Sequence, residues 1–243
     1  GLFLPQGQVR LSAPTPVPAL RLAGILGATA WTAASLPLAS HHPRVPLHRW
    51  SRCVLRQLRV ELDLRGTVQH EPPLWVANHL SWLDPLVLFS LRPSGALTKR
   101  EVGDYPAIGP AIRRLGLAFV DREDPLSRAA AVTRLAAELR SGRPMVLFPE
   151  GTTTCGQGLA PLYEGGLRTA YRCGTTVQAL RFSSEDHAYP WTGDDSLIPH
   201  LMNLARSQVT HVRLEVRDVL EPRHFPSEDA WIDAIRRQLA PHP

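Results

Sequence analysis

Residues 74–85 read LWVANHLSWLDP, and this stretch decides how the chain is expected to fold. The four apolar residues from Leu74 to Ala77 have the length and composition of a buried strand. Pro85 suits the first position of a helix, with Asp84 as the residue that caps it. A strand that passes into a helix through a short loop predicts an α/β domain, and it places His79 on that loop.

His79 and Asp84 are five positions apart. On one continuous helix such residues point about 140° away from each other, so their side chains meet only if the chain turns between them. An imidazole oriented by a carboxylate, with its other nitrogen free, can deprotonate a hydroxyl, and here that hydroxyl could belong to a substrate. The alternative is that Asp84 only caps its helix and His79 is an ordinary loop residue.

Beyond Gly66 the chain alternates between short apolar runs and helical segments. The expected strands are residues 117–120, 145–148, 177–182 and 212–219. The expected helices are residues 85–91, 125–140, 165–171, 197–205 and one that starts near Ser227. The helix 125–140 has the clearest signals, because Asp124 can cap it and Gly142 can end it. The pattern predicts an α/β fold with a mixed or largely parallel sheet flanked by helices.

Residues 1–65 are interpreted as an N-terminal arm and a membrane-associated helical segment, and residues 66–243 as the catalytic domain. Residues 22–40 are uncharged and mainly apolar, close to the roughly 20 residues that span a bilayer. The arginine-rich residues 44–65 are interleaved with leucines and a tryptophan, as in a helix that lies on an anionic membrane. The alternative is an amphipathic helix packed on the domain, with its arginines solvated.

Composition limits the partners only loosely. The net charge of +5 suits anionic lipids, phosphorylated small molecules or nucleic acid equally well. The 3 cysteines are odd in number and lack C-x-x-C spacing, so they indicate neither a disulfide framework nor a structural zinc site, and a cytoplasm-facing protein fits them best. No metal is expected, because His41 and His42 are too isolated to indicate one.

Two further clusters lie at the ends of expected strands. Residues 148–154 read FPEGTTT and offer backbone N–H groups and hydroxyls to a ligand, while Glu150 either orients that ligand or holds the loop. The alternative is a tight turn with Glu150 exposed. Residues 116–122 read GLAFVDR and end on Arg122, whose guanidinium suits a phosphate or, more ordinarily, a surface salt bridge.

The blocks NHLSWLD, GLAFVDR and FPEGTTT, in this order, resemble the glycerolipid acyltransferase family, which includes lysophosphatidic acid acyltransferases. The resemblance runs from about Leu74 to Phe182. It implies that His79 is the general base, Asp84 its orienting partner, and Arg122 a ligand for the acceptor phosphate. It also implies that Glu150, Gly151 and Thr152 bind the acceptor. One departure is that residues 177–180 lack the proline that the family usually has there.

The implied reaction transfers a fatty acyl group from acyl-CoA or acyl carrier protein to the free hydroxyl of lysophosphatidic acid, giving phosphatidic acid. It needs no cofactor beyond the acyl thioester and no nucleic acid, and it implies a place at the cytoplasmic face of the inner membrane of a bacterium. The alternatives are a lyso-ornithine lipid O-acyltransferase, a lipid hydrolase that uses water as the acceptor, and a non-catalytic lipid-binding protein of the membrane surface. An intact pair of His79 and Asp84 speaks against the last.

Overall fold

The computed structural model describes residues 7–10, 18–35, 44–69, 71–99, 117–121, 123–192 and 196–241. Arg122 therefore lies outside the described residues, as does most of the segment that precedes β5.

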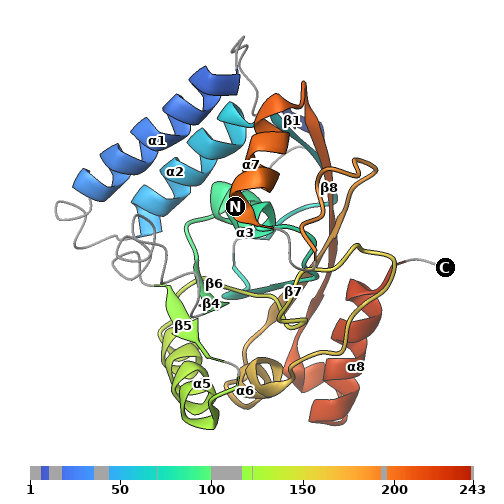
Figure 1. Cartoon of the computed structure of the whole chain (residues 1–243). Coiled ribbons are helices and arrows are strands. Elements are labelled where there is room, and N and C mark those ends of the chain that lie inside the picture. Colours follow the sequence, from blue (N-terminus) through green and yellow to red (C-terminus); the bar gives the residue numbers. More distant parts are fainter. Residues whose placement is uncertain are drawn as a thin grey trace.

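A mostly parallel sheet runs through the centre of the molecule (Figure 1), and eight strands of it are described. Their order across the sheet is β1-β2-β8-β7-β3-β6-β4-β5. Neighbours pair in parallel except β1 with β2 and β7 with β8, which are antiparallel. The strands are β1 (Gly7–Arg10), β2 (Val60–Arg65), β3 (Leu74–Ala77), β4 (Gly95–Lys99), β5 (Ala118–Val120), β6 (Met145–Leu147), β7 (Val177–Ser183) and β8 (Thr210–Leu220). The expectation of a mixed, largely parallel sheet is confirmed.

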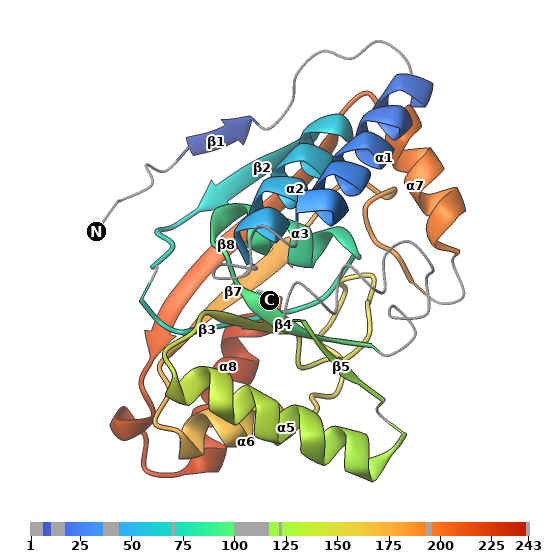
Figure 2. The ribbon, with the colours of Figure 1, turned by 90° about the vertical axis from the view of Figure 1, so that its left-hand side faces the viewer.

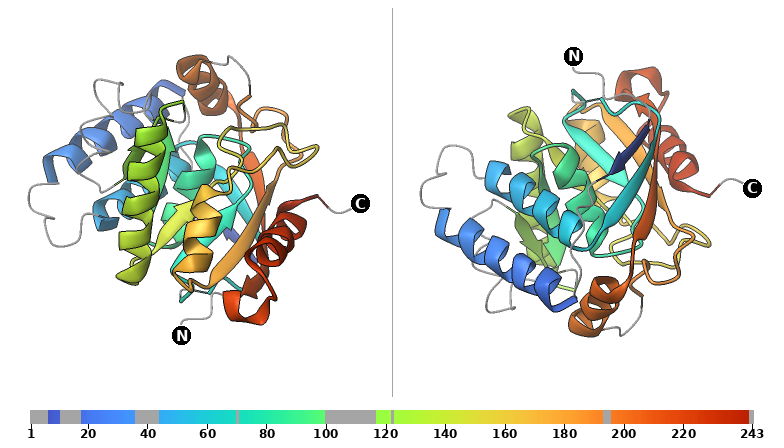
Figure 3. Two further views of the ribbon diagram at one scale, coloured as in Figure 1. Left: turned by 90° about the horizontal axis from the view of Figure 1, so that it is seen from below. Right: turned by 90° about the horizontal axis from the view of Figure 1, so that it is seen from above.

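Helices cover both faces of the sheet. One face carries α1 (Pro18–Ser35), α2 (Arg44–Gln57), α3 (Leu83–Leu91) and α7 (Leu197–Arg206), as the right panel of Figure 3 shows. The other carries α5 (Pro125–Arg140), α6 (Gly165–Arg172) and α8 (Glu228–Leu239), while the short 3-10 helix Pro222–His224 joins β8 to α8. Each layer has its own hydrophobic core, one around Leu55 and Leu83 and the other around Leu135 and Trp231.

The helix α5 shows how closely local sequence signals set the element boundaries. The Asp124 carboxylate accepts hydrogen bonds from the backbone N–H groups of Leu126 at 3.0 Å and Ser127 at 3.2 Å. These are the donors that a helix leaves unpaired at its first turn, and Pro125 has no such donor to lose. Gly142 then adopts a φ of 65°, which ends the helical path as expected.

The arginine-rich segment before residue 66 differs from the single helix that was expected. The helix α2 ends at Gln57, and the alternating residues of β2 pair with β8 instead of continuing the helix. α2 buries Leu47, Val54 and Leu55 in the core and leaves the arginines after its first turn exposed, so it is an amphipathic helix packed on the domain. Arg44, at its start, is instead largely buried and forms an ion pair with Glu138 of α5. β1 pairs with β2 and β2 pairs with β8, so residues before position 66 contribute two strands to the same sheet as residues 66–243.

α1 packs alongside α2 at the edge of this layer (Figure 2). Where the chain is described, no helix has both the length and the apolar character that crossing a bilayer requires.

Candidate active site

His79 lies on the loop that follows the carboxyl end of β3. The preceding residue, Asn78, fixes the start of this loop to β7, because its side chain donates to the Phe182 carbonyl at 3.0 Å and accepts from the Phe182 N–H at 2.6 Å. The block that begins at Phe148 follows β6, which pairs in parallel with β3. Both blocks therefore meet at the same edge of the sheet, where ligands bind in α/β folds.

The side chains of His79 and Asp84 do meet across this turn. His79 Nδ1 lies 2.9 Å from Asp84 Oδ2, and that same oxygen accepts from the backbone N–H groups of Leu80 at 2.6 Å and Ser81 at 2.8 Å. Because this oxygen already accepts two backbone N–H bonds, it suits a third donor, so the contact favours the tautomer with the proton on Nδ1 and Nε2 directed away from Asp84. Asp84 is fully buried, whereas 18% of the His79 side chain is exposed.

Asp84 is not the helix cap that the sequence predicted. α3 begins at Leu83, and the preceding Trp82 makes no side-chain cap hydrogen bond. Asp84 therefore stands in the first turn, and its carboxylate points back to the N–H groups of the loop. In this position the Asp84 carboxylate has three donors, namely two backbone N–H groups of the loop and the His79 ring. A helix cap would give it only the N–H groups of the first turn.

Glu150 holds two loops together from inside the protein. It is 1% exposed, and its carboxylate accepts from the backbone N–H of His79 at 2.7 Å and of Ala160 at 2.9 Å. Burial raises the pKa of Glu150, although both backbone donors favour its charged form. The alternative of an exposed turn residue is wrong, and the contacts show a residue that positions the backbone of His79.

The rest of the third block shapes the loop around the imidazole. Gly151 has a φ of 70°, a conformation that side chains with Cβ rarely adopt, and its N–H donates to the Phe148 carbonyl at 3.1 Å. Thr152 lies exposed on this loop. The N–H of Thr154 donates to the His79 carbonyl at 2.8 Å, so the loop is bonded directly to the residue that it surrounds.

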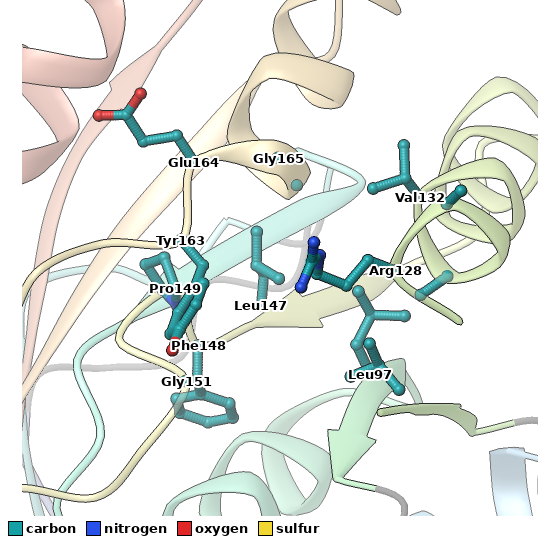
Figure 4. Close-up of a pocket in the computed structure, with 14 residues that line it drawn as sticks. Leu97, Arg128, Val132, Leu147, Phe148, Pro149, Gly151, Tyr163, Glu164 and Gly165 are labelled. Atoms are coloured by element: carbon teal, nitrogen blue, oxygen red, sulfur yellow. The ribbon is translucent and has the colours of Figure 1, made fainter. Parts of the chain in front are cut away.

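An apolar pocket of about 400 Å³ lies beside Phe148, the residue that follows β6 (Figure 4). The His79 ring stacks on Phe148 with centroids 4.3 Å apart, and Phe148 in turn lines the pocket. Figure 4 shows the Arg128 guanidinium extending from α5 into this space. The remaining walls come from β4, β5, β6, α5 and α6, with Leu97, Val120, Val132, Leu147 and Tyr163 among the lining residues. Such walls suit a hydrocarbon chain.

Sequence reasoning missed Tyr189, whose hydroxyl donates to Asp84 Oδ1 at 2.5 Å. The residue is fully buried and lies in the loop after β7. A single tyrosine in a loop has no spacing relative to His79 or Asp84 that could reveal the contact.

Fold and site together define the class of protein. A buried carboxylate behind an imidazole, near an apolar pocket at the carboxyl edge of a parallel sheet, suits an enzyme that acts on a lipid by acid–base chemistry. Within the described residues, no group of three or more His, Cys, Asp or Glu side chains is placed to hold a metal ion.

Comparison with known proteins identifies the family. Residues 59–183 match the family model described as Acyltransferase, and a lyso-ornithine lipid O-acyltransferase of Pseudomonas aeruginosa is 36% identical over 88% of this chain and 84% of its own. A 1-acyl-sn-glycerol-3-phosphate acyltransferase of Neisseria meningitidis serogroup B is 31% identical over 77% of this chain and 76% of its own. The chain belongs to the acyltransferase family and is an acyltransferase of lipid metabolism, as the three sequence blocks predicted.

A solved structure shares the fold. The 1-acyl-sn-glycerophosphate (LPA) acyltransferase of Thermotoga maritima superimposes with a TM-score of 0.64 at 16% identity, covering 92% of this chain and 96% of that one. At this identity the likeness concerns the fold alone.

Proposed function

We propose that the protein transfers a fatty acyl group from an acyl thioester, either acyl-CoA or acyl carrier protein, to the free hydroxyl of a lyso-lipid, with His79 as the general base. The observation that carries the proposal is the 2.9 Å contact of His79 Nδ1 with the buried Asp84, which leaves Nε2 as the basic nitrogen. The apolar pocket beside Phe148 supports a lipid substrate.

The reaction proceeds in two steps on this arrangement. Nε2 takes the proton of the acceptor hydroxyl as its oxygen attacks the thioester carbonyl, and Asp84 stabilises the imidazolium that forms. The tetrahedral intermediate then collapses, the carbon–sulfur bond breaks, and the thiol leaves with the proton that His79 returns. All proton transfers use His79 and the two substrates.

For the acceptor we place lyso-ornithine lipid first and lysophosphatidic acid second. The relative named for lyso-ornithine lipid is the more similar of the two compared above, with 36% identity against 31%. This reverses the order of acceptors that the sequence blocks alone favoured.

A panel of acceptors tests the assignment. Purified protein with labelled acyl-CoA or acyl carrier protein should acylate lyso-ornithine lipid with a higher kcat/KM than lysophosphatidic acid. The reverse preference would make lysophosphatidic acid the first choice of acceptor. Hydrolysis of the acyl thioester without transfer to either lipid would favour the hydrolase alternative, in which water is the acceptor.

Arg122 is the residue proposed to bind the acidic group of the acceptor, phosphate or carboxylate, through its planar guanidinium. Lysine keeps the charge but loses the two-pronged contact, so Arg122→Lys should raise the KM for the acceptor about tenfold and spare that for acyl-CoA. Arg140→Lys, at the last turn of α5, is the matched control. Unchanged acceptor KM values on both lipids would exclude this role.

We further propose that one surface of the protein binds the cytoplasmic face of the inner membrane. The surface consists of the exposed Leu20 and Trp31 of α1, which are eleven positions apart and so share one face of the helix, and of Arg49 of α2, which lines the same groove as Trp31. α1 is tied to α7 by Arg21, whose guanidinium donates to the carbonyls of Ala205 at 2.9 Å and Ser207 at 2.7 Å. Exposed large apolar side chains beside arginines suit an anionic bilayer surface.

The double variant Leu20→Glu/Trp31→Glu should reduce binding to vesicles that contain phosphatidylglycerol at least about tenfold, because burying such side chains contributes about 1.5–3 kcal/mol each. Flotation of protein with vesicles measures this. Leu126→Glu is the control, since Leu126 is 80% exposed but lies on α5 at the other face of the sheet. Equal flotation of the double variant and the control would contradict the proposal. Deleting residues 1–65 is a poorer test, since it also removes β2 and the buried face of α2.

A further inference from the structure

Tyr189 contacts the one side chain on which the orientation of His79 depends. The residue belongs to the loop after β7, beyond the end of the family match at residue 183. Its side chain is fully buried in the core that also contains Leu80 and Leu83. Its hydroxyl lies 2.5 Å from Asp84 Oδ1, a short distance for an O–H···O bond.

The two oxygens of Asp84 have different partners. Oδ2 accepts from His79 Nδ1 and from the backbone N–H groups of Leu80 and Ser81, whereas Oδ1 accepts from Tyr189. The three bonds at Oδ2 hold one end of the carboxylate, and the bond at Oδ1 holds the other. Both ends must be held to keep the carboxylate plane from rotating, and this plane sets the direction of the bond to Nδ1.

Tyr189 can only act as a hydrogen-bond donor here. Burial, together with the adjacent Asp84 carboxylate, raises the pKa of Tyr189 well above its usual range, so the phenol stays protonated. The hydrogen bond that it donates therefore holds Oδ1 of the carboxylate that orients and stabilises the imidazolium.

The loop that carries Tyr189 is bonded to the loop that carries His79. The N–H of Trp191 donates to the Leu80 carbonyl at 2.8 Å. On the other side of Tyr189, Asp186 accepts from the N–H of Ala188 at its carboxylate and from the N–H of Tyr189 at its carbonyl, which shapes the turn. These bonds on both sides of Tyr189 fix its backbone relative to the loop of His79, and so they fix the position from which the hydroxyl donates to Asp84.

We propose that Tyr189 is a positioning residue of the acyl transfer, which orients Asp84 and through it sets the tautomer and the ring direction of His79. The inference rests on the proposed role of His79 as the base. It extends the catalytic pair to three side chains, the third of which comes from a segment that the family model does not cover.

Tyr189→Phe removes one oxygen and keeps the ring in the core. We expect kcat to fall about tenfold, with the KM values for acyl donor and acceptor within about twofold of wild type, since charge-assisted hydrogen bonds contribute more than neutral ones. In ¹⁵N spectra of histidine-labelled protein, the signal of the His79 ring should move from the Nδ1–H tautomer toward a mixture of both. Tyr171→Phe is the control, because Tyr171 packs on Trp231 in the core of the opposite face.

A double-mutant cycle that combines Tyr189→Phe with Asp84→Asn shows whether Tyr189 acts through Asp84. The double variant should then be no slower than Asp84→Asn alone. An unchanged kcat and tautomer in Tyr189→Phe would overturn the inference, as would fully additive losses in the double variant. If Tyr189→Phe fails to fold, the wild-type protein still decides, because the buried Tyr189 hydroxyl proton must then appear as a slowly exchanging NMR signal, and its absence overturns the inference.

His79→Ala, measured in the same series, separates the two proposals. An inactive His79→Ala together with a fully active Tyr189→Phe overturns the role of Tyr189 alone. An active His79→Ala overturns the base assignment and the positioning role with it.

Discussion

His79→Ala should lower kcat at least about a hundredfold, because general acid–base catalysis typically contributes 10²-fold to 10⁴-fold. The expected loss lies in the chemical step, so the KM values for both substrates should change little. Steady-state kinetics with labelled acyl-CoA measures this. Turnover within about tenfold of wild type would remove His79 from the role of base.

The fold should tolerate this change. The His79 ring is partly exposed and its main packing contact is the stacked ring of Phe148, an interaction of about 1 kcal/mol. The backbone N–H that bonds to Glu150 and the carbonyl that accepts from Thr154 remain in the variant. Thermal unfolding should therefore occur within a few degrees of wild type. His211→Ala is the control, because it removes an exposed histidine of β8 outside the site and should leave both kcat and thermal unfolding unchanged.

Elements with a complete set of local signals could be predicted from the sequence. β3 and α5 have the expected boundaries, because an uninterrupted apolar run and a cap of aspartate and proline act over a few residues. The same holds for α8, where the Ser227 side chain accepts from the N–H of Ala230. In each case the residues that set the boundary are close to it in the sequence.

Where the decisive partner is distant in the sequence, prediction failed. β2 alternates apolar and charged residues directly after an amphipathic helix, and only its pairing with β8, some 150 positions further on, distinguishes it from a continued helix. β4 was missed for a similar reason, since its strand pairs with β5 and β6 and has a glycine at its start.

The candidate site follows the same rule. The contact of His79 with Asp84 was predictable, because Pro85 indicates that a helix starts close to Asp84, so the chain must turn between the loop that carries His79 and that helix. The part that Glu150 plays was left open between ligand and loop support, and the structure shows loop support through two backbone N–H groups. Tyr189 was unpredictable, since 105 positions separate it from Asp84 and the core brings them together.

Asp84→Asn is the sharpest test of why the carboxylate is buried behind His79. An asparagine amide fits the same space, because its oxygen can accept from Leu80, Ser81 and His79 while its NH₂ group donates to the Tyr189 oxygen. The variant should therefore fold, with at most about 1–3 kcal/mol lost if that pairing is imperfect.

The negative charge behind the imidazole is what this substitution removes. The imidazolium that forms when His79 takes the hydroxyl proton loses its stabilising partner, and we expect kcat to fall by about 10²-fold to 10⁴-fold. Kinetics and thermal unfolding on the same preparation distinguish this from a loss of structure. A variant with nearly wild-type turnover would mean that Asp84 serves only to hold the loop of residues 79–81, since an amide can accept those N–H bonds as well as a carboxylate does.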